Sequence, residues 1–258
     1  MILNEIVENT KTLLEDTKHS LPLNKLNELA FAQPPAKSLS QALSGNNVKL
    51  IAEVKKASPS KGIICHNFNP VAIAQAYAAS GAAAISVLTE TEYFLGSLDY
   101  LKEIREALAE DRPPLLMKDF ILDPYQIFQA RACGADCLLL IAAILSPSNM
   151  KYLLDLSHDL GMECLVEVHN KKELEAVLAS NARIIGINNR DLQTFKTDIK
   201  LTMKLKKLIP DDRIVVSESG IGCKEDMYEL LSCGVTNFLI GEALVSSQNI
   251  SIKMRELL

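Results

Sequence analysis

The first residue that could take part in chemistry is a lysine that directly follows a short apolar run. The apolar residues 115–117 lead into Lys118, and the helix-start pair Asp123-Pro124 comes soon after. An apolar run of this length between turn residues is typical of a strand that is buried on both faces. Because a lysine is rarely buried without a partner, we expect Lys118, at the end of this strand, to have a charged partner or a chemical task.

Other apolar runs in the chain also end in charged or amide side chains. The residues at these positions are Glu53, Lys55, Glu167, Asn188, Arg190, Glu218 and Glu242. Each alone could be a solvated rim residue or part of a salt bridge between loops. So many on separate strand ends instead indicate one site, because crowded carboxylates and lysines shift one another's pKa values toward those that acid–base catalysis needs.

Short apolar runs, each followed by a loop and an amphipathic segment, supply the elements that position these residues. We expect strands at Val48–Val54, Ala83–Leu88, Leu115–Lys118, Asp136–Ile141, Glu163–Val168, Arg183–Ile187, Arg213–Ser217 and Thr236–Ile240. Helices between them include Pro70–Ala79, Leu98–Ala109, Pro124–Ala132, Lys171–Leu178 and Lys224–Leu231. Strands that alternate with helices pair in parallel. Eight such units predict an α/β fold, a (β/α)8 TIM barrel, with its active site at the carboxyl ends of the strands. A doubly wound open sheet is the alternative, but no G-x-G-x-x-G motif follows the first strand.

The segment before the first strand is expected to be helical. Residues 2–18 carry an approximate apolar stripe, and a second apolar patch precedes the loop signal Gln33-Pro34-Pro35. We expect residues 1–47 to form an N-terminal helical extension packed on the barrel. The whole chain, residues 1–258, then makes one barrel domain, which is an ordinary size for this fold.

Composition and charge narrow the classes of function. The chain is 48% hydrophobic and 23% charged, enough for a substantial core. Its net charge of −5, with no basic block, argues against a nucleic-acid partner. Without a signal peptide or an apolar run near ~18 residues, a cytoplasmic protein with no membrane partner is expected. The six cysteines are scattered and form no C-x-x-C pair, and the four histidines are dispersed. We therefore expect free thiols and no metal or organic cofactor.

Glycines after the last two predicted strands indicate a phosphate site. Ser219-Gly220-Ile221-Gly222 follows one strand and Gly241-Glu242 follows the next. In α/β barrels these two loops commonly bind phosphate through backbone N–H groups, and glycine lets the backbone approach closely. The glycines could simply make tight turns, but Arg190 adds a charged donor. A phosphorylated small molecule is the expected ligand.

Six blocks, in order along the chain, resemble those of the indole-3-glycerol phosphate synthase family. They are Ile51–Ser60, Ile85–Thr89, Met117–Phe120, Leu165–His169, Ile185–Leu192 and Ser217–Ile221. The resemblance covers nearly the whole chain. It departs from the family at Glu90, where aspartate is commoner, and in having no tryptophan.

The resemblance implies a ring closure in tryptophan biosynthesis. The substrate is 1-(2-carboxyphenylamino)-1-deoxyribulose 5-phosphate, which loses carbon dioxide and water as the indole forms. Lys118 matches the family's acid, which protonates the ketone oxygen. Glu53 and Glu167 match positions proposed for the base that removes a ring proton during dehydration. Lys55 is expected to neutralise the substrate carboxylate and to serve as a second acid.

The remaining site residues implied by the resemblance bind rather than transform the substrate. Asn188 and Glu218 are expected to orient the sugar hydroxyls and the charged network. The phosphate is expected to lie against Arg190, Ser219, Gly220, Gly241 and Glu242. The slot for the benzene ring is expected to be lined by Ser58, Pro59, Phe94, Phe120, Leu139, Leu192 and Ile240. Ordinary core packing is the alternative for these apolar residues and is favoured for Leu139, and His169 is interpreted as a loop or rim residue.

Sequence neighbours favour Glu167 over Glu53 as the base. Lys55 lies two residues from Glu53, so both side chains point to the same side of the strand. A paired lysine is expected to keep Glu53 ionised, with Glu53 mainly positioning Lys55. Glu167 stands between two valines, and burial there is expected to raise its pKa toward ~6–7, the range of an effective base.

Two other functions stay open from the residues. A Schiff-base aldolase also uses a strand-end lysine in an α/β barrel, but it would not explain the aromatic slot. A non-catalytic phosphate-binding subunit is expected to lack one of the acid–base residues, whereas all are present. A monomer is expected, and contacts with other enzymes of the tryptophan pathway are left open.

Overall fold

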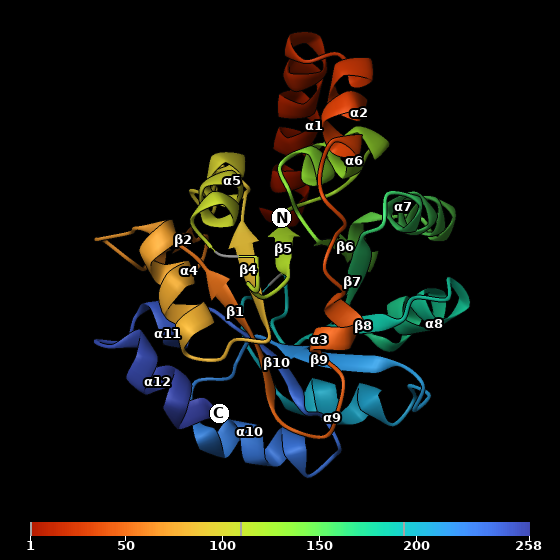
Figure 1. The fold of residues 1–258 in the computed structure, drawn as a ribbon. Helices are drawn as coiled ribbons and strands as arrows, with labels where there is room; N and C mark the ends of the chain where they lie inside the picture. Colours follow the sequence, from red (N-terminus) through yellow and green to blue (C-terminus); the bar gives the residue numbers. More distant parts are fainter. Residues whose placement is uncertain (1, 109, 193) are drawn as a thin grey trace.

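The computed structural model describes residues 2–108, 110–192 and 194–258, and this part of the chain contains a closed barrel of eight parallel strands (Figure 1). The strands are β1 (Lys49–Val54), β4 (Ala84–Leu88), β5 (Leu115–Lys118), β6 (Cys137–Ile141), β7 (Glu163–Val168), β8 (Ile184–Asn188), β9 (Ile214–Glu218) and β10 (Asn237–Ile240). Each strand pairs with the next, and β1 closes the ring against β10 with Leu50 opposite Phe238. The predicted (β/α)8 barrel is confirmed, and the open sheet is wrong.

The strands begin and end within one residue of their predicted bounds. Their side chains are almost all buried, since one set points into the barrel and the other packs under the helices. A run of two residues has no such signature. The segment after β1 therefore contains a small antiparallel hairpin that the sequence did not indicate, in which β2 (Ala57–Ser58) pairs with β3 (Gly62–Ile63).

Helices surround the barrel, and several begin at side chains that accept a backbone N–H of the first turn. They are α4 (Pro70–Ala79), α5 (Leu98–Ala107), α6 (Pro124–Ala132), α7 (Pro147–Asp159), α8 (Lys171–Ala179), α9 (Lys200–Lys206), α10 (Lys224–Leu231), α11 (Glu242–Val245) and α12 (Ile250–Leu257), with a 3-10 turn at Ala142–Ile144. Asn69, Asp123 and Asn170 are such N-caps, which explains why these helices begin where they do. Helix α5 ends at Ala107, and its predicted end, Ala109, lies outside the described residues.

The segment before β1 runs along the side of the barrel and then beneath it. Helices α1 (Ile2–Ser20) and α2 (Leu23–Phe31) stand beside α6 (Figure 1), where Leu14 and Leu26 pack with Tyr125. The short α3 (Leu39–Ala42) then places Leu39 and Leu43 against the residues that fill the barrel interior. The barrel is thereby closed at the amino ends of its strands.

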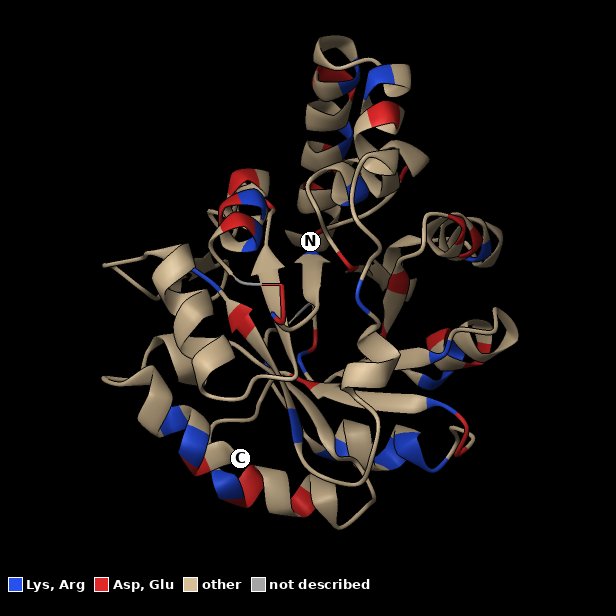
Figure 2. Cartoon of the chain, viewed as in Figure 1, with Lys and Arg blue, Asp and Glu red and all other residues tan. Residues whose placement is uncertain are grey.

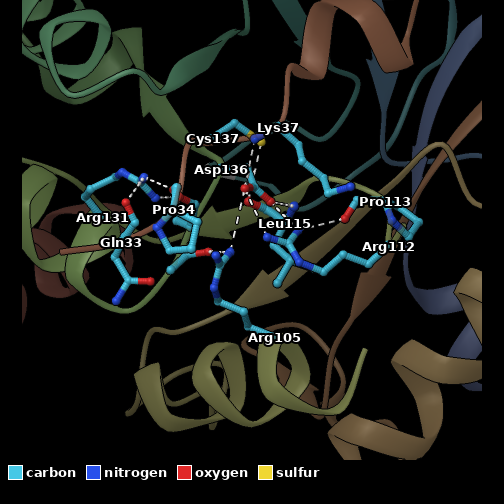
Figure 3. A network of polar contacts seen from close by, with 12 residues as sticks. Gln33, Pro34, Lys37, Arg105, Arg112, Pro113, Leu115, Arg131, Asp136 and Cys137 are labelled. Atoms are coloured by element: carbon cyan, nitrogen blue, oxygen red, sulfur yellow. Dashed lines mark hydrogen bonds and ion pairs between the residues drawn. The ribbon is translucent and has the colours of Figure 1, made fainter. Parts of the chain in front are cut away.

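A buried carboxylate ties this segment to the barrel (Figure 3). Asp136, just before β6, accepts hydrogen bonds from both terminal nitrogens of Arg112 and from the backbone N–H groups of Leu115 (2.8 Å) and Lys37 (3.0 Å). Arg105 adds an ion pair at 3.8 Å. All of these contacts lie at the amino ends of β5 and β6, so the Asp136 network stabilises the face opposite the strand carboxyl ends.

The outer surface mixes charges of both signs. Figure 2 shows acidic and basic residues interspersed along α5 and α12. None of the helices in the described part of the chain is long and apolar enough to cross a membrane. The six cysteines are all free thiols, as predicted.

Candidate active site

A cavity of about 470 Å³ opens at the carboxyl ends of the barrel strands. Every residue that the sequence assigned to the site lines it: Glu53, Lys55, Ser58, Pro59, Phe94, Lys118, Phe120, Leu139, Glu167, Asn188, Arg190, Leu192, Glu218, Ser219, Gly220, Ile240, Gly241 and Glu242. They come from most of the barrel strands and from the loops that follow them. The structure therefore brings together what the sequence only placed at strand ends.

Lys118 lies at the centre of three buried carboxylates from three other strands. Its Nζ is 2.9 Å from Glu218 Oε2, 3.5 Å from Glu167 Oε2 and 3.9 Å from Glu53 Oε2. Burial by itself would lower the pKa of Lys118. Attraction to the three carboxylates outweighs burial and raises that pKa above its ordinary value. Lys118 is therefore a permanent cation in the ligand-free site.

The carboxylates around Lys118 differ in their affinity for a proton. Burial, together with repulsion from Glu167 and Glu53, raises the pKa of Glu218 to about 7 despite Lys118. Burial also acts to raise the pKa of Glu167, but Lys118 and His169 outweigh it and lower the value to about 2. Near neutral pH Glu218 can therefore gain or lose a proton, while Glu167 is ionised.

The predicted rise in the pKa of Glu167 is wrong. Two cations reach this carboxylate: Lys118 from β5, and His169, whose Nε2 lies 3.2 Å from Glu167 Oε1. His169 was interpreted as a loop or rim residue: it does lie in the loop after β7, but its side chain is part of the charged cluster and not of the rim. Its position two residues after Glu167, on the same side of the strand, was the available signal.

An apolar slot adjoins the charged cluster. The predicted pair of Lys55 and Glu53 is confirmed, with 3.0 Å between Nζ and Oε1. Lys55 Nζ also lies 5.6 Å from the centre of the Phe94 ring, within the range of a cation–π contact. The rings of Phe94 and Phe120 are 6.1 Å apart at an angle of 37°. Leu139 was expected either to line the slot or to pack in the core, and it does both: it lines the cavity and packs in the barrel core.

Two carboxylates that the sequence did not assign to the site hold the aromatic slot in place. Glu90 is 4% exposed and accepts the backbone N–H groups of residues 92, 93 and 94. Asp119 accepts the N–H of Phe120 (2.8 Å) and the hydroxyl of Thr89. Asp119 directly follows β5 and Glu90 lies two residues after β4, and this position near a strand end was the signal in the sequence.

The first turns of α1 also line the cavity, through Ile2, Leu3 and Ile6. Their apolar stripe predicted a helix with one buried face. It gave no indication that this face would cover the site, because the stripe does not identify the surface it packs on.

Two glycines in the barrel make room for the carboxylates. A Cβ atom on Gly186 would lie 2.1 Å from Glu218 Oε1, and one on Gly241 would lie 2.4 Å from Glu53 Oε1. Gly241, assigned to the phosphate from the sequence, therefore also sets the position of Glu53.

The predicted phosphate loops follow β9 and β10, whereas the aromatic slot residues Phe94 and Phe120 lie after β4 and β5. Ser219 and Gly220 have φ values of 65° and 74°, in the left-handed region that residues other than glycine rarely adopt. This conformation sets the direction of their backbone N–H groups. Arg190 Nη2 lies 3.8 Å from Glu242 Oε2, and Lys61 also pairs with Glu242. The Glu242 side chain thus holds two cations at this end, and only its backbone could face an anion.

Comparisons with known proteins agree on one family. The sequence profile described as indole-3-glycerol phosphate synthase matches residues 3–257. Indole-3-glycerol phosphate synthase of Dehalococcoides mccartyi (strain CBDB1) is 57% identical, with 100% of both chains covered. That of Desulforamulus reducens is 46% identical over 100% of this chain and 97% of its own.

Solved structures show the barrel alone. 3-Hexulose-6-phosphate synthase from Salmonella typhimurium aligns with a TM-score of 0.65 at 11% identity, covering 81% of this chain and 96% of its own. Thiamine phosphate pyrophosphorylase from Pyrococcus furiosus gives 0.63 at 16% identity, covering 82% and 94%. The sequence relatives are far closer, and by that likeness the chain belongs to the indole-3-glycerol phosphate synthase family.

Proposed function

We propose a division of labour among the cavity residues for the reaction of this family, the decarboxylating ring closure that yields indole-3-glycerol phosphate. The observation that carries it is Lys118, held among three buried carboxylates between an aromatic slot and the phosphate loops. The substrate carboxylate leaves as neutral carbon dioxide and the ketone oxygen leaves as water. Converting the ketone oxygen to water consumes two protons. The proton lost from a ring carbon replaces one of them, so each turnover takes up one proton from solvent.

Lys118 delivers the first proton, to the ketone oxygen, as the aromatic carbon attacks the ketone carbon. An ammonium at that point stabilises the negative charge that develops on oxygen. Glu218 is 2.9 Å from Lys118 Nζ and holds a proton near neutral pH, because burial raises its pKa to about 7. Glu218 then returns a proton to Lys118, which prepares the lysine for the dehydration step.

We assign the base of the dehydration to Glu53 rather than to Glu167. Both oxygens of Glu167 face cations, Lys118 and His169, which makes it a weak proton acceptor. Glu53 Oε2 is buried and accepts no hydrogen bond from the described residues, and Lys118 Nζ lies 3.9 Å from it, farther than the 3.5 Å that separates Lys118 Nζ from Glu167 Oε2. It lies at the cavity wall, while Oε1 binds Lys55. This reverses the preference that the sequence gave.

The binding residues divide the substrate into three parts. Lys55 neutralises the carboxylate beside the slot, where the benzene ring lies between Phe94 and Phe120. Asn188, which also accepts the backbone N–H of Arg190 at 3.0 Å, orients a sugar hydroxyl. The phosphate lies against Arg190, Ser219, Gly220 and Gly241, with the backbone N–H of Glu242 as a further donor.

We further propose that the chain works as one barrel domain, residues 1–258 with residues 1–47 as its extension. It is proposed to be a monomer in the cytoplasm that acts on a small sugar-phosphate substrate. The six unpaired cysteines support a reducing compartment.

A Schiff-base aldolase is disfavoured by the charges around Lys118. A lysine must lose its proton before it attacks a ketone, whereas the carboxylates raise the pKa of Lys118. Borohydride trapping with a keto-sugar phosphate is expected to leave the protein unlabelled.

The direct test is to mix the purified protein with the carboxyphenylamino substrate and follow the indole fluorescence of the product. Fluorescence should rise with repeated turnover, and Lys118→Met should lower kcat by ~10²–10⁴-fold while the variant still binds a phosphate-bearing product analogue. Absence of product with the unaltered protein would refute the activity. A Lys118→Met variant with more than about a tenth of the original kcat would refute only the role of the lysine.

A further inference from the structure

His169 lies in the wall between the active-site cavity and a second cavity. Its Nε2 is 3.2 Å from Glu167 Oε1, and its Nδ1 is 3.3 Å from Glu173 Oε2 on α8. The backbone N–H of His169 also donates to Glu173 Oε2 at 2.7 Å. The ring is thus fixed between two carboxylates, with a side chain that is only 10% exposed.

The second cavity lies behind the loop that follows β8. It has a volume of about 570 Å³ and is lined by His169, Asn170 and Glu173 together with residues of that loop. Glu167 lines the active-site cavity instead. His169 therefore contacts a reactive-site carboxylate on one side and an accessible cavity on the other, and it does not itself line the substrate cavity.

Charge counting shows what the imidazole contributes. At the barrel mouth Glu53, Glu167 and Glu218 face Lys55 and Lys118, which leaves one negative charge unbalanced if all are ionised. Burial acts to lower the pKa of His169, but Glu167 and Glu173 outweigh it and raise the value to about 10. A protonated His169 places a positive charge next to Glu167, and the carboxylate of Glu173 on the other side of the ring balances that imidazolium.

We propose that His169 is a positioning residue for the ring-closure reaction: its imidazolium, braced by Glu173, holds Glu167 ionised and aimed at Lys118. The exchangeable proton is then left to Glu218, next to Lys118 Nζ, instead of being shared between Glu167 and Glu218. The proposal rests on the proposed function of the cavity, because it assigns a purpose to a proton that the reaction must move.

The groups that act on Glu167 come from several elements, and only one of them is varied in the test. His169 lies just after β7, Lys118 lies on β5 and Glu218 lies on β9. Asn188 of β8 donates a hydrogen bond to Glu167. On its other side His169 faces Glu173 and Asn170 of the α8 start, with Arg190 and Asp191 also lining the second cavity. Replacing His169 removes one of the two cations on Glu167 and leaves the rest in place.

The test is the pH profile of kcat/KM for the unaltered protein, His169→Gln and Glu173→Gln. The limb set by the proton of the Glu218–Glu167 pair should move to higher pH by about one unit or more in His169→Gln, because the loss of a nearby cation raises the pKa of both carboxylates. Glu173→Gln removes the brace alone and should move it less, in the same direction. His158→Gln, a replacement of a remote histidine on α7, is the matched control and should leave the profile unchanged. A purely structural role would lower activity equally at all pH values, with the limb in place, and that result would overturn the proposal.

Chemical rescue gives a second readout. The adjoining cavity offers an entry route, so imidazole added to His169→Ala should restore kcat/KM several-fold, and it should have no effect on His169→Gln, whose side chain fills the space. If His169→Ala does not fold, the His169→Gln profile decides alone.

A measurement without substrate separates this proposal from the proposed function. In an NMR titration of the histidine side chains, His169 should remain protonated at pH 8, whereas a ring that titrates near its ordinary pKa of ~6.5 would contradict the proposal. That outcome is independent of whether the protein produces indole.

Discussion

At the scale of single residues, the site depends on glutamate side chains that differ in their affinity for a proton. Glu53, Glu167 and Glu218 all face Lys118, yet burial raises the pKa of Glu218 while Lys118 and His169 lower that of Glu167. Groups with pKa values that are pushed apart can take different roles in one reaction. The unequal proton affinities follow from burial and from which cations lie within 4 Å: Lys118 reaches all three carboxylates from another strand, and His169 reaches Glu167 from the residue just after its own strand.

The two candidate bases can be told apart by a single-turnover experiment. Because Glu53 Oε2 accepts no hydrogen bond from the described residues, Glu53→Gln should release carbon dioxide and then stall before indole forms. Glu167→Gln should slow both steps together, since it disturbs Lys118. The measurement follows carbon dioxide and indole fluorescence separately. If Glu167→Gln alone stalls between the steps, the base is Glu167.

Glu218 gives a prediction about stability and pH. Its pKa is raised from 4.5 to about 7, so the folded state holds the proton more tightly than the unfolded state. The stability it contributes is present below pH ~4.5 and is lost as the pH rises to about 7. Glu218→Gln stays neutral, so it should match the unaltered protein near pH 5 and be more stable near pH 8, by roughly 2–3 kcal/mol at most. Tm measured at both pH values decides this, with the exposed Glu8→Gln as control. An equal effect at the two pH values would show that Glu218 is ionised in the folded protein at both.

The residues that form the site were predictable from the sequence, whereas their protonation states were not. Most residues assigned to the site lie near or after the carboxyl end of a strand, and parallel strand ends converge, so most of the cavity lining followed from the fold. The pKa of Glu167 did not follow, because Lys118 reaches it from another strand and the neighbouring His169 was not recognised as a cation facing it. Glu90 and Asp119 were missed because their carboxylates bind backbone N–H groups, which have no sequence signature.

At the scale of elements, the loops after the strands are held by the strands' own polar residues. Glu90 gathers three consecutive N–H groups of the loop that carries Phe94, and this loop sets the ring over Lys55. The slot is thus built by main-chain hydrogen bonds more than by packing of the rings, which are 6.1 Å apart.

Removing the Glu90 carboxylate should therefore loosen the slot. In Glu90→Ala three donors lose a buried acceptor, a loss of ~1–3 kcal/mol each in the worst case. We expect kcat/KM to fall by about 10- to 100-fold, mainly through KM, because the ring binds equally in ground and transition states. Glu90→Asp, which keeps a carboxylate, should recover most of the activity, and the exposed Glu92→Ala should change little. Steady-state kinetics with normal kcat and KM for Glu90→Ala would contradict this account of the loop.

At the scale of the whole molecule, the N-terminal segment connects the two ends of the barrel. The start of α1 lines the cavity through Ile2 and Ile6, and α3 closes the opposite end through Leu39. Between them, residues 33–37 are fixed to the Asp136 network (Figure 3). The sequence predicted a helical extension but not this route, because an apolar stripe identifies a buried face and not its partner.

The Asp136 network should be a determinant of stability and not of catalysis. Asp136 is fully buried and faces Arg112, Arg105 and two backbone N–H groups. Asp136→Asn leaves those cations without a counter-charge, and breaking a buried pair in this way costs ~3–5 kcal/mol. For a chain of this size that corresponds to a fall in Tm on the order of 10 °C.

Kcat at a temperature where the variant is folded should stay within about twofold of the unaltered value, since the network lies at the amino ends of the strands and catalysis at the carboxyl ends. Asp155→Asn is the matched control, because its carboxylate is exposed and pairs with Lys151 in the preceding turn of α7. It should lower Tm by no more than about 1–2 °C. Proteolysis of Asp136→Asn should also cut first within residues 33–37, where the linker loses its anchor on Lys37 N–H. A variant with an unchanged Tm, or one that folds normally but loses turnover, would show that the Asp136 network serves another purpose than fastening the linker to the barrel.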